Sequence, residues 1–247
     1  MNNTLANLPV PVLSLPRWRV NFRPLFYNPE RLKSLSDCFK TIEKTHLHLR
    51  GWDFPHLSSN TIRRGQGSNW IGSWSDFMGH VEYWRFYQSG QFLYLSSIRE
   101  VTEPDWKAHI LETMKYHFSF DKNIKIEEVP GFIDFVNFNY TVTEFLEFAA
   151  RLAQAGIYDG QFRLCISLID IKGFLLSANA NRAWDYAYVS NENVLEREIL
   201  LDPTDVIATS AEKALETIIW FFERFGWLSP SIGILKDDQQ KFLKGSY

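Results

Sequence analysis

The stretch between residues 80 and 98 places the tightest constraint on the fold, because it has the pattern of two paired β-strands. His80–Tyr87 and Gln91–Ile98 are rich in aromatic and branched residues, and Ser89-Gly90 between them favours a tight turn. This pattern predicts an antiparallel β-hairpin. Aromatic side chains fall on both faces of its first strand, so the sheet is either covered on both sides or presents aromatic rings to a partner.

Further strands and helices are predicted on both sides of this hairpin. Apolar alternation or short apolar runs predict six more strands, at Trp18–Phe22, His46–Leu49, Phe132–Tyr140, Gln161–Ile171, Gly173–Ala178 and Glu196–Leu201. Capping residues followed by apolar residues at helical spacing predict about three main helices, at Leu35–Thr45 behind Ser34, at Thr141–Ala155 and at Thr209–Phe225. The fold class is therefore α+β, with mixed, mainly antiparallel sheets.

Charge divides the chain into two halves. Residues 1–118 carry 14 Lys and Arg against 10 Asp and Glu, and they hold all six histidines and six of the nine tryptophans. Residues 119–247 carry 12 basic against 19 acidic residues. Each half has its own strand–helix–strand pattern, so we predict a basic, Trp- and His-rich half and an acidic half, as two domains or as one continuous domain.

Composition excludes several classes of protein. Hydrophobic residues make up 45% and charged residues 22% of the 247, which is typical of globular chains and not of disordered or fibrous ones. Two cysteines are too few for a disulfide framework, and no apolar run approaches the ~20 residues of a membrane span. The N-terminal stretch lacks the basic head of a signal peptide and contains prolines. We therefore expect a cytoplasmic protein without a membrane partner.

The segment from residue 50 to residue 56 contains side chains suited to a ligand pocket. Arg50 offers a rigid fork for carboxylate or phosphate, and Trp52 offers a stacking face. Asp53 and His56 can exchange protons with a ligand. In the alternative interpretation this segment is a structural turn, in which Trp52 belongs to the core and Arg50 pairs with an internal acid.

Three histidines in the same region raise the question of a metal site. His46 and His48 would share one face of the predicted strand, and His56 follows after the turn. No cysteine and no acidic pair stands at ligand spacing beside them. We therefore predict neither a metal nor a cofactor.

The polar, glycine-bearing segment 58–69 is predicted to be an exposed loop. Arg63 and Arg64 precede Gly65 and Gly67, so the loop could wrap a phosphate with backbone amides and guanidinium groups. The segment matches no nucleotide-triphosphate motif. The alternative is a solvated loop without a ligand.

Tryptophans cluster after this loop and in the hairpin. Trp70, Trp74 and Trp84 either pack in the core or form a partner surface together with Arg85. An arginine among aromatic residues needs an anionic partner or access to solvent. We therefore expect four side chains to line one shared surface, although the last two point to opposite sheet faces: Arg50, Trp52, Trp84 and Arg85.

Four stretches carry a resemblance to a known family: Ser34–His56, Trp70–Leu95, Tyr140–Gln154 and Phe221–Trp227. Together they resemble a family of largely uncharacterised bacterial proteins, in some of which this region follows a Schlafen AlbA-type DNA-binding domain. The resemblance runs over residues 17–227 and implies a shared fold. It supplies no catalytic residues, and the chain has no room for the AlbA-type domain, so DNA binding does not follow from it.

Three functional hypotheses remain from the sequence. The leading one is a non-enzymatic binding or adaptor module that recognises a protein partner or an anionic ligand, beside nucleic-acid or phage-defence machinery. It rests on the excess of Trp, the charge split and the lack of a catalytic signature. The alternatives are direct nucleic-acid binding through Arg50, Arg63, Arg64 and Arg85, and an enzyme acting on nucleotides or nucleic acid. The oligomeric state is not predicted.

Overall fold

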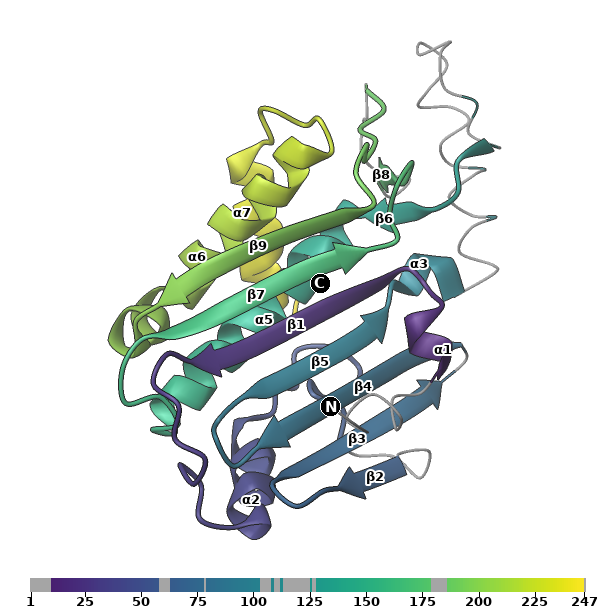
Figure 1. Cartoon of the computed structure of the whole chain (residues 1–247). Coiled ribbons are helices and arrows are strands. Elements are labelled where there is room, and N and C mark those ends of the chain that lie inside the picture. The colour runs from purple at the N-terminus through teal and green to yellow at the C-terminus, as the bar shows by residue number, and fades with distance from the viewer. Residues whose placement is uncertain are drawn as a thin grey trace.

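A seven-stranded antiparallel sheet is the frame of the protein (Figure 1). The computed structural model describes residues 10–57, 63–77, 79–102, 108, 112, 125, 128–178 and 186–246. The strands lie in the order β2-β3-β4-β5-β1-β7-β9, so one sheet holds strands from both sides of residue 118. Their bounds are Arg17–Pro24 (β1), Arg63–Gln66 (β2), Trp70–Phe77 (β3), His80–Tyr87 (β4), Phe92–Ser97 (β5), Phe162–Ile169 (β7) and Val194–Leu201 (β9).

The long helices cover one face of this sheet (Figure 1). The described helices are α1 (Val10–Leu13), α2 (Leu35–Thr45), α3 (Arg99–Thr102), α5 (Phe135–Gln154), α6 (Pro203–Arg224) and α7 (Ile232–Leu243). On the opposite face, Val12 of α1 packs against Val81 and Leu95. A short parallel pair, β6 (Phe132–Asp134) and β8 (Leu175–Ser177), lies beyond the main sheet. No helix in the described part of the chain has the length and hydropathy needed to cross a bilayer.

The core lies between the sheet and α5. Alternate residues of β1 are buried, and their rings meet the aromatic side of the helix: Trp18 lies 4.9 Å from Phe138, and Phe22 lies 5.9 Å from Phe148, between ring centroids. Burying one such side chain contributes about 1.5–3 kcal/mol to stability. The aromatic residues along one side of α5 therefore hold the centre of the sheet in place.

The predicted hairpin and the first helix are confirmed. In β4 and β5, Phe86 pairs with Phe92 across a turn where Gly90 has φ +81°, a conformation that glycine adopts without strain. Ser34 caps α2, and its Oγ accepts a hydrogen bond from the Asp37 amide at 3.1 Å. The α+β class with a mainly antiparallel sheet is confirmed as well.

The prediction of one strand over Phe132–Tyr140 is wrong. β6 ends at Asp134, whose Oδ1 accepts hydrogen bonds from the amides of Val136 and Asn137 and so starts α5 there. The predicted start at Thr141 therefore lies well inside the helix. Four buried residues recur at helical spacing, which outweighs the alternation seen in the sequence: Phe135, Phe138, Val142 and Phe145.

Three other local predictions are corrected. His46–Leu49 forms no strand, since only Leu47 bridges to Phe54 before the chain turns back. α6 begins at Pro203, and the predicted start at Thr209 is a kink inside it, with φ −132° and ψ 26°. The end of the predicted loop, from residue 63, pairs with β3 as an edge strand. Residues 58–62 and the side chains of Arg63 and Arg64 lie outside the described part of the structure.

Removing the cap of α5 tests this account of where the helix begins. We expect Asp134→Ala to lower the free energy of unfolding by about 1–2 kcal/mol, because two amides lose their acceptor. Asp134→Asn retains an amide oxygen that can cap and should cost less. Urea unfolding of both variants provides the measurement, and equal losses would show that the cap is not what Asp134 contributes.

Candidate ligand-binding pocket

A small polar cavity opens where β4, β5 and α3 meet α5. Its volume is about 40 Å³, enough for a few water molecules or one small polar group. Aromatic side chains of the core, including Trp18 and Phe138, form its floor. Six ionisable side chains line it: Arg50, His80, Tyr94, Arg99, Glu100 and Glu144. Such a concentration of ionisable groups in a largely buried place marks it as the candidate functional site.

Arg50 is held in this pocket by α5. Its Nη1 donates to Oδ1 of Asn137 at 2.9 Å, and its Nη2 donates to Oγ1 of Thr141 at 2.8 Å. Its Nε lies 3.1 Å from Oε2 of Glu144. The three partners stand one turn apart on the helix, which aligns them along the guanidinium. Arg50 is therefore paired with an acidic side chain of the same chain, as the alternative interpretation of this segment predicted. Its side chain also lines the cavity.

Two buried glutamates of the pocket have pKa values close to 7. Burial raises the pKa of Glu144 to about 7, and the positive charge of Arg50 offsets only part of this rise. Burial also raises the pKa of Glu100 to about 7, against the hydrogen bond that Oε1 of Glu100 accepts from Nδ2 of Asn137 at 2.9 Å. The charge of the pocket therefore changes around pH 7.

His80 and Trp52 form the aromatic side of the pocket. Their rings are stacked, with centroids 5.4 Å apart and planes at 18°. The Arg99 guanidinium carbon lies 6.0 Å from the Trp52 ring centroid. Burial, followed by the charges of Arg99 and Arg50, lowers the pKa of His80 to about 4, so this imidazole is neutral at pH 7.

A second group of polar side chains anchors the loop behind Trp52. Asp53 Oδ1 lies 3.1 Å from Nδ1 of His56, and its Oδ2 accepts from the Leu57 amide at 2.9 Å. Glu82 of β4 accepts from the His56 amide at 3.0 Å, and Nε1 of Trp84 donates to the His56 carbonyl at 3.1 Å. Burial raises the pKa of Glu82 to about 8, which the hydrogen bond from His56 only partly counters. The loop thus depends on side chains from one face of β4.

The structure divides the predicted site residues between two places. Arg50, Trp52, Asp53 and His56 do come together around the pocket and its loop. Trp84 is 3% exposed and packs in the core. The predicted shared surface is therefore wrong for the hairpin residues, because the pleat of β4 sends Trp84 and Arg85 to opposite faces.

Arg85 belongs to the face that the long helices leave uncovered. Its guanidinium carbon lies 3.9 Å from the Trp70 ring centroid and 5.4 Å from that of Tyr83, and Trp74 packs beside Tyr83. Further along this face, charges are paired across strands and loops. The ion pairs are Arg17–Asp170 at 2.6 Å, Arg19–Glu196 at 2.7 Å and Arg163–Glu198 at 3.2 Å.

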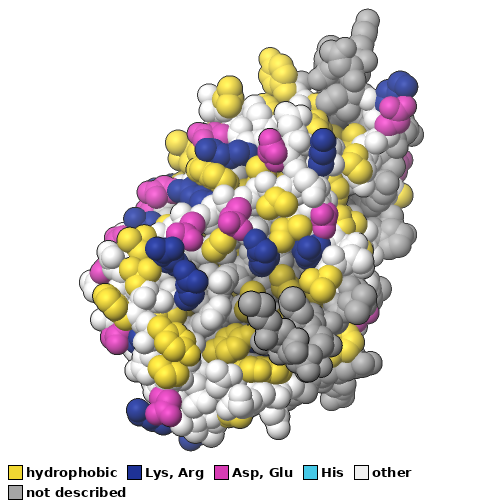
Figure 2. All heavy atoms as spheres, in the orientation of Figure 1, with side chains coloured by type: hydrophobic (Ala, Val, Ile, Leu, Met, Phe, Trp, Pro, Cys, Tyr) yellow, Lys and Arg dark blue, Asp and Glu magenta, His cyan; other side chains and the backbone are white. Residues whose placement is uncertain are grey.

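Figure 2 shows the result of this pairing: basic and acidic side chains interleave over the described surface of the sheet. A nucleic-acid backbone is bound by a stripe of uncompensated Lys and Arg. The described part of this face does not form such a stripe. The polar pocket is therefore the better candidate for a function.

The sequence patterns do not reveal several of the residues that build the pocket. The capping box places Thr141 and Glu144 at a helix start and the alternation places Asn137 in a strand, because neither pattern shows the first two turns of α5. Glu100 follows the predicted hairpin and gave no motif. A signal was present in the spacing of Asn137, Thr141 and Glu144, which places three polar groups on one side of a helix.

Comparisons of the chain with protein-family models, with curated proteins and with solved structures found no match. The resemblance to the region that follows AlbA-type domains stays a prediction. The function is therefore argued from the geometry of the pocket.

The raised pKa of Glu82 predicts how stability depends on pH. A carboxyl whose pKa is about 8 in the folded chain and near 4.5 when unfolded stabilises the fold while it is protonated, and this contribution is lost as the pH rises to 8. Between pH 6.5 and 8.5 we expect a loss of about 2 kcal/mol from this group. Urea unfolding at several pH values provides the measurement.

Glu82→Gln is the matched control for this prediction. The amide oxygen of Gln can still accept from the His56 amide but does not titrate. We expect the variant to be less dependent on pH over the same interval. Parallel stability curves for the wild type and the variant would contradict the assignment.

Proposed function

We propose that the protein is a binding module whose pocket receives one anionic group, a carboxylate or a phosphate. The observation that carries the proposal is the bonding of Arg50. Two of its three partners, Asn137 and Thr141, are neutral, and the third is a carboxyl with a pKa of about 7. The charge of this largely buried guanidinium is therefore only half compensated at neutral pH.

An incoming anion would exchange with Glu144 at the guanidinium. Neutral Asn137 and Thr141 keep Arg50 in place during this exchange, since both hydrogen bonds are independent of the carboxylate. Arg99 adds a second positive charge to the lining. The small volume admits the head group alone, so the rest of the ligand would stay at the mouth beside Trp52.

The direction of the pH dependence follows from the groups around the pocket. Glu144 interacts electrostatically with Arg50, Glu82 and Tyr94. Glu100 accepts a hydrogen bond from Asn137 and is close to the charge of Asp134. Below pH 7 both glutamates are mostly neutral and the two arginines dominate; above it, two negative charges oppose an anion. The affinity for an anion should therefore fall as the pH rises through 7.

Titration calorimetry with inorganic phosphate, acetate and a short peptide with a free C-terminal carboxylate tests the proposal. We expect binding to be at least about tenfold tighter at pH 6 than at pH 8, because each carboxyl with a pKa of about 7 that opposes the anion changes the affinity about tenfold over this interval. The peptide arm distinguishes a protein partner from a free ion, and its amidated form should not bind.

Two variants make the result specific. Glu144→Gln removes one of the two competing charges, so we expect it to bind the anion more tightly than the wild type at pH 8 and to depend less on pH. Arg163→Gln removes a charge that is paired on the uncovered face and should leave the affinity unchanged. No binding at either pH, or the same affinity at pH 8 in Glu144→Gln and Arg163→Gln, would overturn the proposal.

A further inference from the structure

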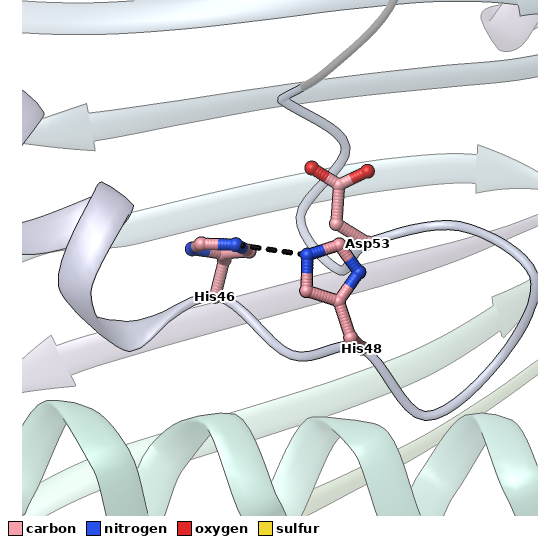
Figure 3. Close-up of side chains that lie close together, drawn as sticks. All are labelled: His46, His48 and Asp53. Atoms are coloured by element: carbon pink, nitrogen blue, oxygen red, sulfur yellow. Dashed lines mark hydrogen bonds between the residues drawn. The ribbon is translucent and has the colours of Figure 1, made fainter.

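Two imidazoles meet at the end of α2. Figure 3 shows the rings of His46 and His48 edge to face, with their nitrogens turned toward each other and Asp53 beside them. Nε2 of His46 lies 3.2 Å from Nε2 of His48. His46 is partly exposed and His48 is exposed, so solvent and dissolved ions reach both rings.

The backbone fixes which nitrogen of His46 carries the proton. Nδ1 of His46 lies 2.5 Å from the Glu43 carbonyl oxygen, which can only accept a hydrogen bond. Nδ1 is therefore the donor, and the lone pair on Nε2 of the neutral ring accepts a hydrogen bond from Nε2 of His48. His48 has to shift this proton to its Nδ1 when its Nε2 binds a metal. A carbonyl bound to the far nitrogen in this way is the usual support of a metal-ligating histidine.

The fold also brings a carboxylate to the two rings. The bridge between Leu47 and Phe54 turns the chain back on itself and places Asp53 next to the histidines. One ligating atom from each of the three side chains lies within 4.8 Å of the other two. Figure 3 shows the Asp53 oxygens turned toward the far side, where His56 and Leu57 hold them. A hydrogen-bonded carboxylate oxygen retains a lone pair for a metal.

We propose that His46, His48 and Asp53 form a binding site for Zn²⁺, with the fourth position open to water. With zinc–nitrogen bonds of ~2.0–2.1 Å, the separation of 3.2 Å between the imidazole nitrogens corresponds to an N–Zn–N angle of about 100°, close to tetrahedral. Two histidines and one carboxylate are a frequent zinc ligand set. The carbonyl end of α2 adds a favourable dipole for a cation. This site is independent of anion binding in the pocket.

Two positively charged side chains near this site repel a bound cation and so weaken metal binding. Arg151 donates to the His46 carbonyl at 2.6 Å, and Lys44 stands in the last turn of α2. Coordination bonds to two imidazoles and a carboxylate have to exceed this repulsion. The sequence predicted no metal, because no cysteine and no acidic pair stands at ligand spacing beside the histidines; Asp53 reaches His46 and His48 only through the turn of the chain.

Titration of the metal-free full chain with Zn²⁺ tests the proposal, with Co²⁺ as a spectroscopic probe. We expect one zinc per chain, and visible Co²⁺ absorption typical of four-coordinate nitrogen and oxygen ligands. His46→Asn keeps a donor for the Glu43 carbonyl but removes the ligand, and His48→Asn removes the exposed one. Each should weaken zinc binding by at least about tenfold.

Asp170→Asn is the control, since it removes an exposed carboxylate that pairs with Arg17 on the uncovered face and is not a proposed ligand. We expect it to keep zinc affinity within a few-fold of the wild type. Circular dichroism without metal separates loss of a ligand from loss of folding, and the exposed His48 makes its variant the safer one. Fewer than one zinc per chain, or equal weakening in the His48 and Asp170 variants, would overturn the proposal.

Discussion

The contact between α5 and the centre of the sheet is the interaction on which the rest of the structure depends. β1 alone links the hairpin strands to β7 and β9, and its buried face rests on the aromatic side of α5. The rings of Phe138, Phe145 and Phe148 therefore join segments that are more than a hundred residues apart in the sequence. Without this helix the two sides of the sheet would share hydrogen bonds but not a core.

The same helix explains why the pocket is charged and yet stable. Its apolar stripe covers the sheet, while Asn137, Thr141 and Glu144 lie along its border and receive Arg50. A buried guanidinium without such partners would cost several kcal/mol. Burial, in turn, raises the pKa of the Glu100 and Glu144 carboxyls to about 7. The balance of charge in the pocket is thus set by packing rather than by the number of acids and bases.

The two faces of the sheet differ for a physical reason. On the covered face, buried polar groups such as the Glu82 carboxyl are held by hydrogen bonds. On the uncovered face, Arg19 and Arg163 are exposed and pair with acids on nearby strands at modest gain. Two ion pairs of this face, Arg17–Asp170 and Arg19–Glu196, join the basic half to the acidic half, so part of the charge asymmetry in the sequence is compensated there.

The sequence alone was enough to predict the α+β class, the hairpin and the helix behind Ser34, because a tight turn, alternation and a cap act over a few residues. It also singled out Arg50, Trp52, Asp53 and His56. Tertiary structure decided that Phe132–Tyr140 is mostly helical, because its aromatic residues gain more by packing on β1 than by extending a short strand. It also decided that Glu144 is the partner of Arg50 and that Asp53 reaches His46 and His48. These contacts join residues that are far apart in the sequence or on opposite sides of a turn, so no local sequence pattern predicts them.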